Sequence, residues 1–168
     1  MDVDKRRDRE NQAVIAWRRH NHNNQKWDIV YVDEDTVQNG LIAQKPFRLL
    51  SKMRGRRALT RSGNKIVIRD KNNSNDQIFV FDDKTNSIQP KQDRSLSVDI
   101  EDYGKDRTIM FRKNENIWSQ HFTMKGEQMV NERGLVFDVA GGKDVNNQKV
   151  IVWKSHKSLN QKWVVDYV

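Results

Sequence analysis

The chain has 168 residues, enough for one domain or for one domain and part of another. It contains no cysteine, which excludes disulfide frameworks and thiolate metal sites. Its formal net charge is +8, and no stretch approaches the roughly 20 apolar residues of a membrane-spanning helix. The N-terminal MDVDKRRDRENQ lacks the apolar core of a signal peptide. We therefore expect no membrane span, and the missing cysteine and signal peptide favour an intracellular protein.

The first segment in chain order, residues 1–32, is a copy of the last, residues 137–168. An ungapped alignment gives 15 identical residues in 32, and NQKWDIVYV near the start matches NQKWVVDYV at the end. Self-similarity of this kind indicates a repeat architecture. The stretch that follows, DEDTVQNGLIAQKP, has no copy elsewhere, and we interpret residues 33–45 as a linker.

Residues 45–71 form a strongly basic segment. Ten Lys or Arg stand against one acid, Asp70, so the segment carries +9 and the rest of the chain sums to −1. Concentrated charge attracts anionic partners, although a solvated face that maintains solubility is the alternative. The candidate residues of a polyanion-binding patch are Arg48, Lys52, Arg54, Arg56, Arg57, Arg61, Lys65 and Arg69.

Weaker copies of the repeat fill the middle of the chain. KIVIRDKNNSNDQIFVFD (65–82) and TIMFRKNENIWSQHFTM (108–124) each read as a short strand, a polar turn, Gln-x-aromatic and a second strand. Four short strands cannot close a core alone, so several units must pack together. We expect each aromatic to lie in the core, above a glutamine that bonds the backbone. The four pairs are Gln25/Trp27, Gln77/Phe79, Gln120/Phe122 and Gln161/Trp163.

Three repeats of about 40 residues with Gln-x-Trp or Gln-x-Phe resemble the ricin-B-type β-trefoil. GLVFDVAGGKDVNNQKVIVWKSHKSLNQKWVVDYV (134–168) is similar to that family's repeat along its full length. The resemblance implies an all-β fold of twelve strands in three four-stranded repeats with pseudo-threefold symmetry. It also implies that the Gln-x-Trp positions build the shared core and that carbohydrate sites lie in shallow pockets of individual repeats.

Strand counting suggests how the chain is divided. Residues 46–168 supply the twelve strands of one β-trefoil, and residues 1–32 supply an extra repeat, interpreted as the last third of a preceding trefoil in a tandem array. The alternative division of the chain places a trefoil at about residues 1–132, and the last third of the repeat pattern then remains as an extra segment. We prefer the first because the two ends of the chain are the most alike.

The resemblance places a sugar pocket in the last repeat. Such a pocket needs a carboxylate that accepts from hydroxyls, a ring that stacks on the sugar, and an amide. Asp138, Trp153 and Asn160 fall at these positions beside Gln161, whereas Ile151 stands where family members often carry glutamine. Alternatively, Asp138 fixes the following loop through backbone amides. The first segment repeats the set as Asp2, Trp17, Asn24 and Gln25.

The middle repeats lack this set. We place Thr60 and Ser97 at the carboxylate position, and Arg69 and Arg112 at the ring position. Neither repeat is expected to bind sugar, so each module would hold one site.

No motif indicates an enzyme, a cofactor or a metal site. Two functions remain, with a glycan or an acidic protein as partner besides neighbouring trefoil modules of the same chain. The first is a carbohydrate-binding module; the second is a scaffold that binds an acidic polymer or other polyanion through residues 45–71. Nucleic acid is an unlikely partner because that segment offers only Phe47 for base stacking.

Overall fold

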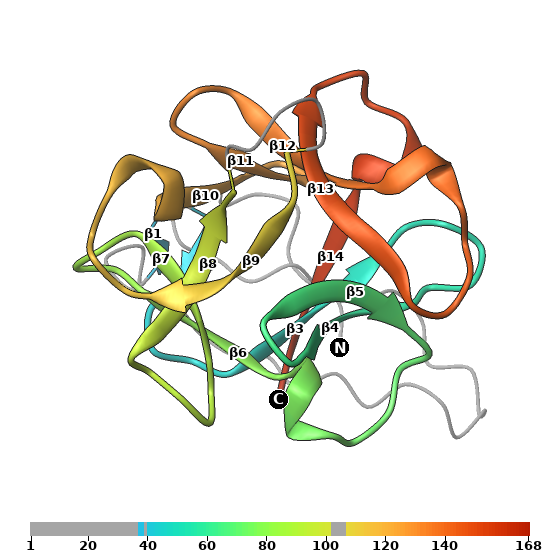
Figure 1. Ribbon diagram of the computed structural model, residues 1–168. Coiled ribbons are helices and arrows are strands. Elements are labelled where there is room, and N and C mark those ends of the chain that lie inside the picture. The colour runs from blue at the N-terminus through green and yellow to red at the C-terminus, as the bar shows by residue number, and fades with distance from the viewer. Residues whose placement is uncertain (1–36, 39, 102–106) are drawn as a thin grey trace, which may run out of the picture. The chain divides into compact units, whose positions relative to one another are not determined.

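The computed structural model describes residues 37–38, 40–101 and 107–168, so the predicted first repeat (1–32) lies outside the described residues. The described chain is built of short strands (Figure 1). None of its helices is long and apolar enough to cross a membrane. Two short strands, β1 (Val37–Gln38) and β2 (Leu41–Ile42), pair with each other. The other described strands are β3 (Phe47–Ser51), β4 (Ala58–Ser62), β5 (Lys65–Arg69), β6 (Phe79–Asp82), β7 (Ser87–Pro90), β8 (Leu96–Ile100), β9 (Ile109–Lys113), β10 (Phe122–Lys125), β11 (Gln128–Asn131), β12 (Leu135–Val139), β13 (Gln148–Lys154) and β14 (Trp163–Tyr167).

The strands β3 to β14 pair in a pattern that repeats three times. Antiparallel hairpins β4–β5, β8–β9 and β12–β13 alternate with the pairs β6–β7, β10–β11 and β14–β3. Bridges of β5 to β13, β5 to β9 and Thr108 to Ile151 join the three hairpins around the centre of the view in Figure 1. The predicted fold class, an all-β trefoil of three four-stranded repeats, is confirmed.

Aromatic residues from all three repeats meet in one core. The rings of Phe122 and Phe137 lie 5.0 Å apart, and Trp163 packs edge-on against Phe137 at 6.4 Å. The rings of Phe79 and Phe111 stack 6.0 Å apart. Burial of each such ring stabilises the fold by roughly 1.5–3 kcal/mol. A repeat that cannot hide these rings alone therefore gains its stability from its neighbours.

A buried glutamine fixes the turn of each described repeat. Gln77, Gln120 and Gln161 are fully buried, and each ends a one-turn 3-10 helix, η2 (Asn75–Gln77), η3 (Trp118–Gln120) or η5 (Leu159–Gln161). Each donates to a backbone carbonyl seven residues earlier and accepts from a backbone N–H five residues earlier. The predicted structural role of these three glutamines is confirmed, whereas Gln25 lies outside the described residues.

The second half of the expected linker packs onto the trefoil. Leu41 is fully buried in the core, and the backbone N–H of Ile42 donates to the Tyr167 hydroxyl at 2.9 Å. Gly40 approaches so closely that a Cβ there would lie 2.2 Å from the backbone oxygen of Met124. Only glycine fits at this contact, so residues 40–42 belong structurally to the domain.

Candidate functional site

The outward face of the β12–β13 hairpin carries two of the predicted site residues, Asp138 and Trp153, and the short helix η5 carries Asn160 and Gln161. Side chains alternate between the two faces of a strand, so Phe137 and Val139 enter the core while Asp138 points away from it. Cross-strand pairing places Asp138 opposite Ile151, two residues before Trp153. The hairpin therefore brings the carboxylate and the indole onto one face.

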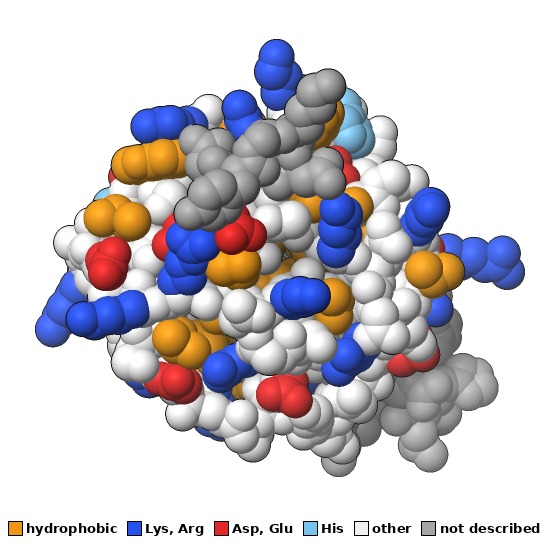
Figure 2. Space-filling model, in the orientation of Figure 1, with side chains coloured by type: hydrophobic (Ala, Val, Ile, Leu, Met, Phe, Trp, Pro, Cys, Tyr) orange, Lys and Arg blue, Asp and Glu red, His pale blue; other side chains and the backbone are white. Residues whose placement is uncertain are grey.

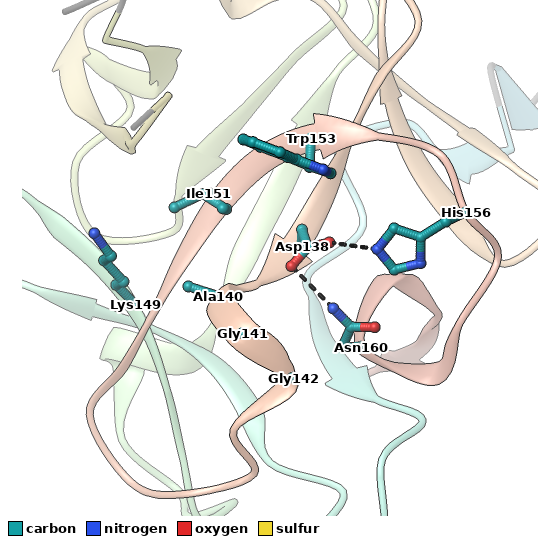
Figure 3. A pocket seen from close by; sticks show the side chains of 9 residues that line it. All are labelled: Asp138, Ala140, Gly141, Gly142, Lys149, Ile151, Trp153, His156 and Asn160. Atoms are coloured by element: carbon teal, nitrogen blue, oxygen red, sulfur yellow. Dashed lines mark hydrogen bonds and ion pairs between the residues drawn. The ribbon is translucent and has the colours of Figure 1, made fainter. Parts of the chain in front are cut away.

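Three side chains converge on the Asp138 carboxylate, which is only 4% exposed, and Figure 3 shows two of them, Asn160 and His156. Asn160 donates to Oδ1 at 2.9 Å, and Gln161 donates to Oδ2 at 2.7 Å. The Nε2 atom of His156 lies 3.2 Å from Oδ2. The partners of Asp138 are therefore side chains, whereas the alternative hypothesis required the backbone amides of the following loop. The arrangement fixes the carboxylate without any of those amides.

A cavity of about 550 Å³ opens beside this carboxylate. Asp138, Trp153 and Asn160 line it together (Figure 3). Trp153 is 47% exposed, so its ring is accessible, and the opposite wall at Gly141 and Gly142 has no side chain to obstruct it. The cavity offers one acidic group, one amide and one open aromatic surface.

Two further lining residues, His156 and Lys149, were missed from the sequence. The sequence did contain a hint for His156, because the duplicated segment has a histidine, His20, at the equivalent position. The repeat does not show, however, that the His156 ring faces a carboxylate. Lys149 aligns with Ala13 and had no signal.

Gln161 does not line the cavity. It lies beneath Asp138 and also donates to the backbone oxygen of Lys154 at 2.9 Å. Its effect on a ligand would therefore pass through the position of the Asp138 carboxylate. The counterparts in the first segment, Asp2, Trp17, Asn24 and Gln25, lie outside the described residues.

A family model for the ricin-type beta-trefoil lectin domain matches residues 38–163. The chain belongs to this family. No curated protein matches the sequence. Among solved structures, the C-half of the earthworm R-type lectin is 18% identical, with a TM-score of 0.64 over 74% of this chain and 99% of that one. The Abrus precatorius agglutinin is 20% identical, with a TM-score of 0.66 over 74% of this chain and 47% of that one. ThreeFoil, a designed threefold-symmetric protein, is 14% identical, with a TM-score of 0.63 over 73% and 99%.

In this ricin-type lectin domain the carboxylate position of the β8–β9 repeat is Asp99, and the prediction of Ser97 was wrong. Asp99 accepts from Gln120 at 3.0 Å, as Asp138 does from Gln161. Strand side chains repeat every two residues, so a two-residue error in register keeps the same face and leaves no pattern to reveal it. The β8–β9 repeat thus has a buried acid.

The ring position of the other two repeats of the lectin domain is occupied by arginines in internal contacts. Arg112 bonds Glu101 at 3.0 Å, and Arg69 bonds Asn147 at 2.7 Å. In the β4–β5 repeat Thr60 takes the carboxylate position and accepts from Gln77. Neither repeat presents a free aromatic ring above an acid.

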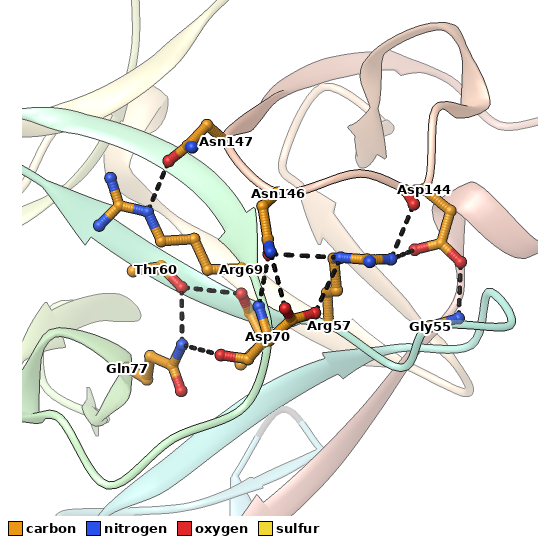
Figure 4. A network of polar contacts seen from close by, with 10 residues as sticks. Gly55, Arg57, Thr60, Arg69, Asp70, Gln77, Asp144, Asn146 and Asn147 are labelled. Carbon is orange, nitrogen blue, oxygen red and sulfur yellow. Dashed lines mark hydrogen bonds and ion pairs between the residues drawn. The ribbon is translucent and has the colours of Figure 1, made fainter.

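Part of the basic segment of the lectin domain is neutralised internally, and Figure 4 shows this for Arg57. Arg57 forms ion pairs with Asp144 at 2.5 Å and with Asp70 at 3.2 Å. The backbone N–H of Gly55 donates to the same Asp144 carboxylate at 2.6 Å. These contacts connect the first and last repeats, so they serve the fold.

Acids outside the basic segment neutralise three more of its residues, Arg48, Lys52 and Lys71, the last by an ion pair with Asp166 at 2.7 Å. Lys52 and Lys162 both bond Glu127, and these bonds hold the pKa of Glu127 below its ordinary value. Arg48 is 7% exposed, and its Nη1 lies 3.9 Å from Asp166. Neither Lys52 nor Arg48 is therefore freely presented to an anionic polymer.

The remaining cations of the segment have different surroundings. Arg61 lies 5.6 Å from the centre of the Phe111 ring and donates to a backbone oxygen. Arg54, Arg56 and Lys65 are exposed and form no ion pair within the part of the chain that the structure describes. Figure 2 shows Lys and Arg scattered over one face with Asp and Glu between them. The net charge of the segment therefore overstates its attraction for a polyanion.

Proposed function

We propose that residues 46–168 are a non-catalytic carbohydrate-binding module with one sugar pocket, on the β12–β13 hairpin. The observation that carries the proposal is the buried Asp138 carboxylate beneath the exposed ring of Trp153 in a cavity. Related structures hold sugars: the earthworm lectin half is a complex with GalNAc, and the Macrolepiota procera lectin, 14% identical with a TM-score of 0.62 over 75% of this chain and 97% of that one, is a complex with lactose.

The contacts of Asp138 indicate how a sugar would be held. An ionised carboxylate has about four acceptor positions, and Asn160, Gln161 and His156 use three of them. One sugar hydroxyl takes the remaining position, and a second displaces the exposed His156. A hydrogen bond to a charged group is about twice as strong as a neutral one, so Asp138 sets the orientation of the sugar.

The other two groups complete the recognition. The Trp153 ring covers the apolar face of the pyranose, which contributes buried area to a ligand that is otherwise polar. The Asn160 side chain keeps its oxygen free to accept a hydroxyl, because its amide nitrogen already bonds Asp138 and Val139. No step requires a general acid or a nucleophile, so the module binds sugar without transforming it.

Affinity would come from repetition. A shallow pocket with one carboxylate binds a monosaccharide weakly, and linked copies raise the effective concentration of the second binding event. We propose that residues 1–32 are the last third of a preceding trefoil and that the module recurs in a tandem array. The support is the 15 identities in 32 aligned residues, which include Asp2, Trp17 and Asn24.

The scaffold alternative has weaker support. It relied on the charge of residues 45–71, and the ion pairs of Arg57, Lys52 and Arg48 remove part of that charge from any external partner. The salt dependence of binding distinguishes the two functions. Ion pairs between exposed cations and the phosphates or carboxylates of a polyanion are screened by about 0.5 M salt. Binding that survives this salt and is competed by free monosaccharide supports the sugar module.

The sharpest test compares two buried acids in one chain. Asp138→Asn and Asp99→Asn make the same change, and each Asp accepts from the glutamine of its own repeat. We expect binding to a glycan array to be lost in Asp138→Asn and retained in Asp99→Asn. Equal binding by Asp138→Asn and wild type contradicts the site. Loss in both variants contradicts a single pocket.

A further inference from the structure

A second hollow, of about 680 Å³, lies between the β6–β7 hairpin, the 91–95 turn and the end of β9. The described residues that line it differ from those lining the pocket on the β12–β13 hairpin. Figure 1 shows β7, β8 and β9 on the left of the molecule and β13 at the upper right. The hollow is therefore a separate place on the surface.

Arg94 is held over this hollow by neutral groups. Its Nε donates to the Gln89 side-chain oxygen at 2.6 Å, and its Nη2 donates to the Gln44 side-chain oxygen at 2.6 Å. Gln89 is 2% exposed and is itself fixed by a bond to Asp82 at 3.0 Å. No carboxylate pairs with Arg94 in the described chain. The guanidinium is thus positioned without an ion pair in the described chain, and three of its five N–H donors stay open.

The backbone of Gln44 is strained at this contact. Its φ is +59°, in the left-handed region that residues other than glycine, asparagine and aspartate rarely adopt. The backbone N–H of Gln44 donates to the Phe81 oxygen at 2.9 Å, which holds the residue there. Such strain persists where the surroundings hold a residue in place. Here the group that Gln44 positions is Arg94.

Two lysines and two acids share the hollow. Lys84 and Lys113 are exposed and have no ion-pair partner among the described residues. Both Asp82 oxygens already accept bonds, from the Gln89 amide and from the backbone N–H of Lys84. Asp83 receives only a long bond of 3.5 Å from Gln44, so it can still accept from a ligand. The hollow therefore contains both unpaired cations and an acceptor for hydroxyls.

We propose that this hollow binds a small hydroxylated anion, either a sugar acid or a sugar phosphate. The planar fork of an arginine matches a carboxylate or phosphate, so Arg94 takes the anionic group with help from Lys84 and Lys113. The hydroxyls of the ligand donate to Asp83. A neutral sugar lacks the group that Arg94 recognises.

The test is a titration of the ¹⁵N-labelled 168-residue chain with glucuronate, glucose 6-phosphate, inorganic phosphate and glucose. We expect the two sugar anions to shift the amide resonances of residues 82–84, 94 and 113, and the tighter of them identifies the anionic group. Arg94→Ala should weaken binding by at least about tenfold, the loss of one charge-assisted contact. Lys91→Ala removes a neighbouring exposed cation that does not line the hollow, and should bind as wild type does.

Three results overturn the proposal. The first is glucose shifting the resonances of residues 82–84, 94 and 113 as tightly as glucuronate does, and the second is inorganic phosphate shifting them as tightly as both sugar anions. The third is unchanged binding in Arg94→Ala. If that variant does not fold, Lys113→Ala replaces it: a several-fold loss supports the proposal, and wild-type affinity overturns it. None of these results depends on the pocket at Asp138.

Discussion

Gln161 and Asp138 are joined by a buried hydrogen bond of 2.7 Å between Nε2 and Oδ2. The same Gln161 amide donates to the backbone oxygen of Lys154, and its oxygen accepts from the backbone N–H of His156. One side chain therefore fixes both the turn of the last repeat and the carboxylate of the candidate pocket. Fold and site are coupled at this residue.

Substituting this glutamine should affect stability and binding together. Gln161→Ala leaves buried polar groups without partners, at a cost of about 1–3 kcal/mol in the free energy of unfolding, and it frees Asp138 to move. Gln77→Ala is the matched control, since Gln77 fixes its turn without bonding an acid. Urea unfolding should show similar losses in both variants, and glycan binding should weaken in Gln161→Ala only. Normal glycan binding by folded Gln161→Ala contradicts the coupling.

Trp153 should matter for ligand and little for the fold. Because the side chain is half exposed, Trp153→Ala should change the free energy of unfolding by less than about 1 kcal/mol. Removing the ring should weaken sugar binding by about tenfold or more. Trp153→Phe keeps an aromatic surface and should retain most of the affinity. Calorimetry and thermal unfolding measure both effects, and unaltered affinity in Trp153→Ala excludes stacking.

Leu41 tests whether the supposed linker belongs to the domain. Leu41→Ala empties a fully buried position, which should cost about 2–5 kcal/mol. Leu159→Ala makes the same change where the side chain is 55% exposed, and should stay within about 0.5 kcal/mol of wild type. Urea midpoints compare the two. Equal, small effects mean that residues 40–42 do not contribute to the core.

The fall in the free energy of unfolding at low pH should depend on Glu127. Hydrogen bonds from Lys52 and Lys162 lower the pKa of Glu127 from 4.5 in the folded state. A folded pKa below the unfolded value gives stability that is present above pH 4.5 and is lost as the pH falls through the folded pKa. Glu127→Gln should flatten this part of the stability profile and leave the slope above pH 5 unchanged. An identical acid limb in wild type and Glu127→Gln rules out this contribution.

The sequence was sufficient for the fold because the Gln-x-aromatic pairs are local. Gln77, Gln120 and Gln161 each bond backbone five and seven residues away, so the motif and its contacts share one short stretch. Asp138 and Trp153 were placed by the family resemblance, and the hairpin on which both lie brings them to one cavity.

Contacts between distant segments could not be predicted in the same way. Arg57 meets Asp144 across 87 residues, and no pattern in the basic segment shows that its charge is neutralised there. The position of Asp99 was missed because Ser97 lies on the same face of the strand. Leu41 reads as part of a loop, since two short strands carry too little periodicity to show a buried side chain.

The pairing of β14 with β3 runs from Trp163↔Ser51 to Tyr167↔Phe47, and it joins the two ends of the trefoil. During synthesis on the ribosome, β3 is made more than a hundred residues before its principal partner. Until β14 leaves the exit tunnel, β3 remains an open sheet edge that can pair with another nascent chain. The trefoil therefore closes only after β14 has left the exit tunnel, and nascent chains on crowded polysomes are exposed to misassembly until then.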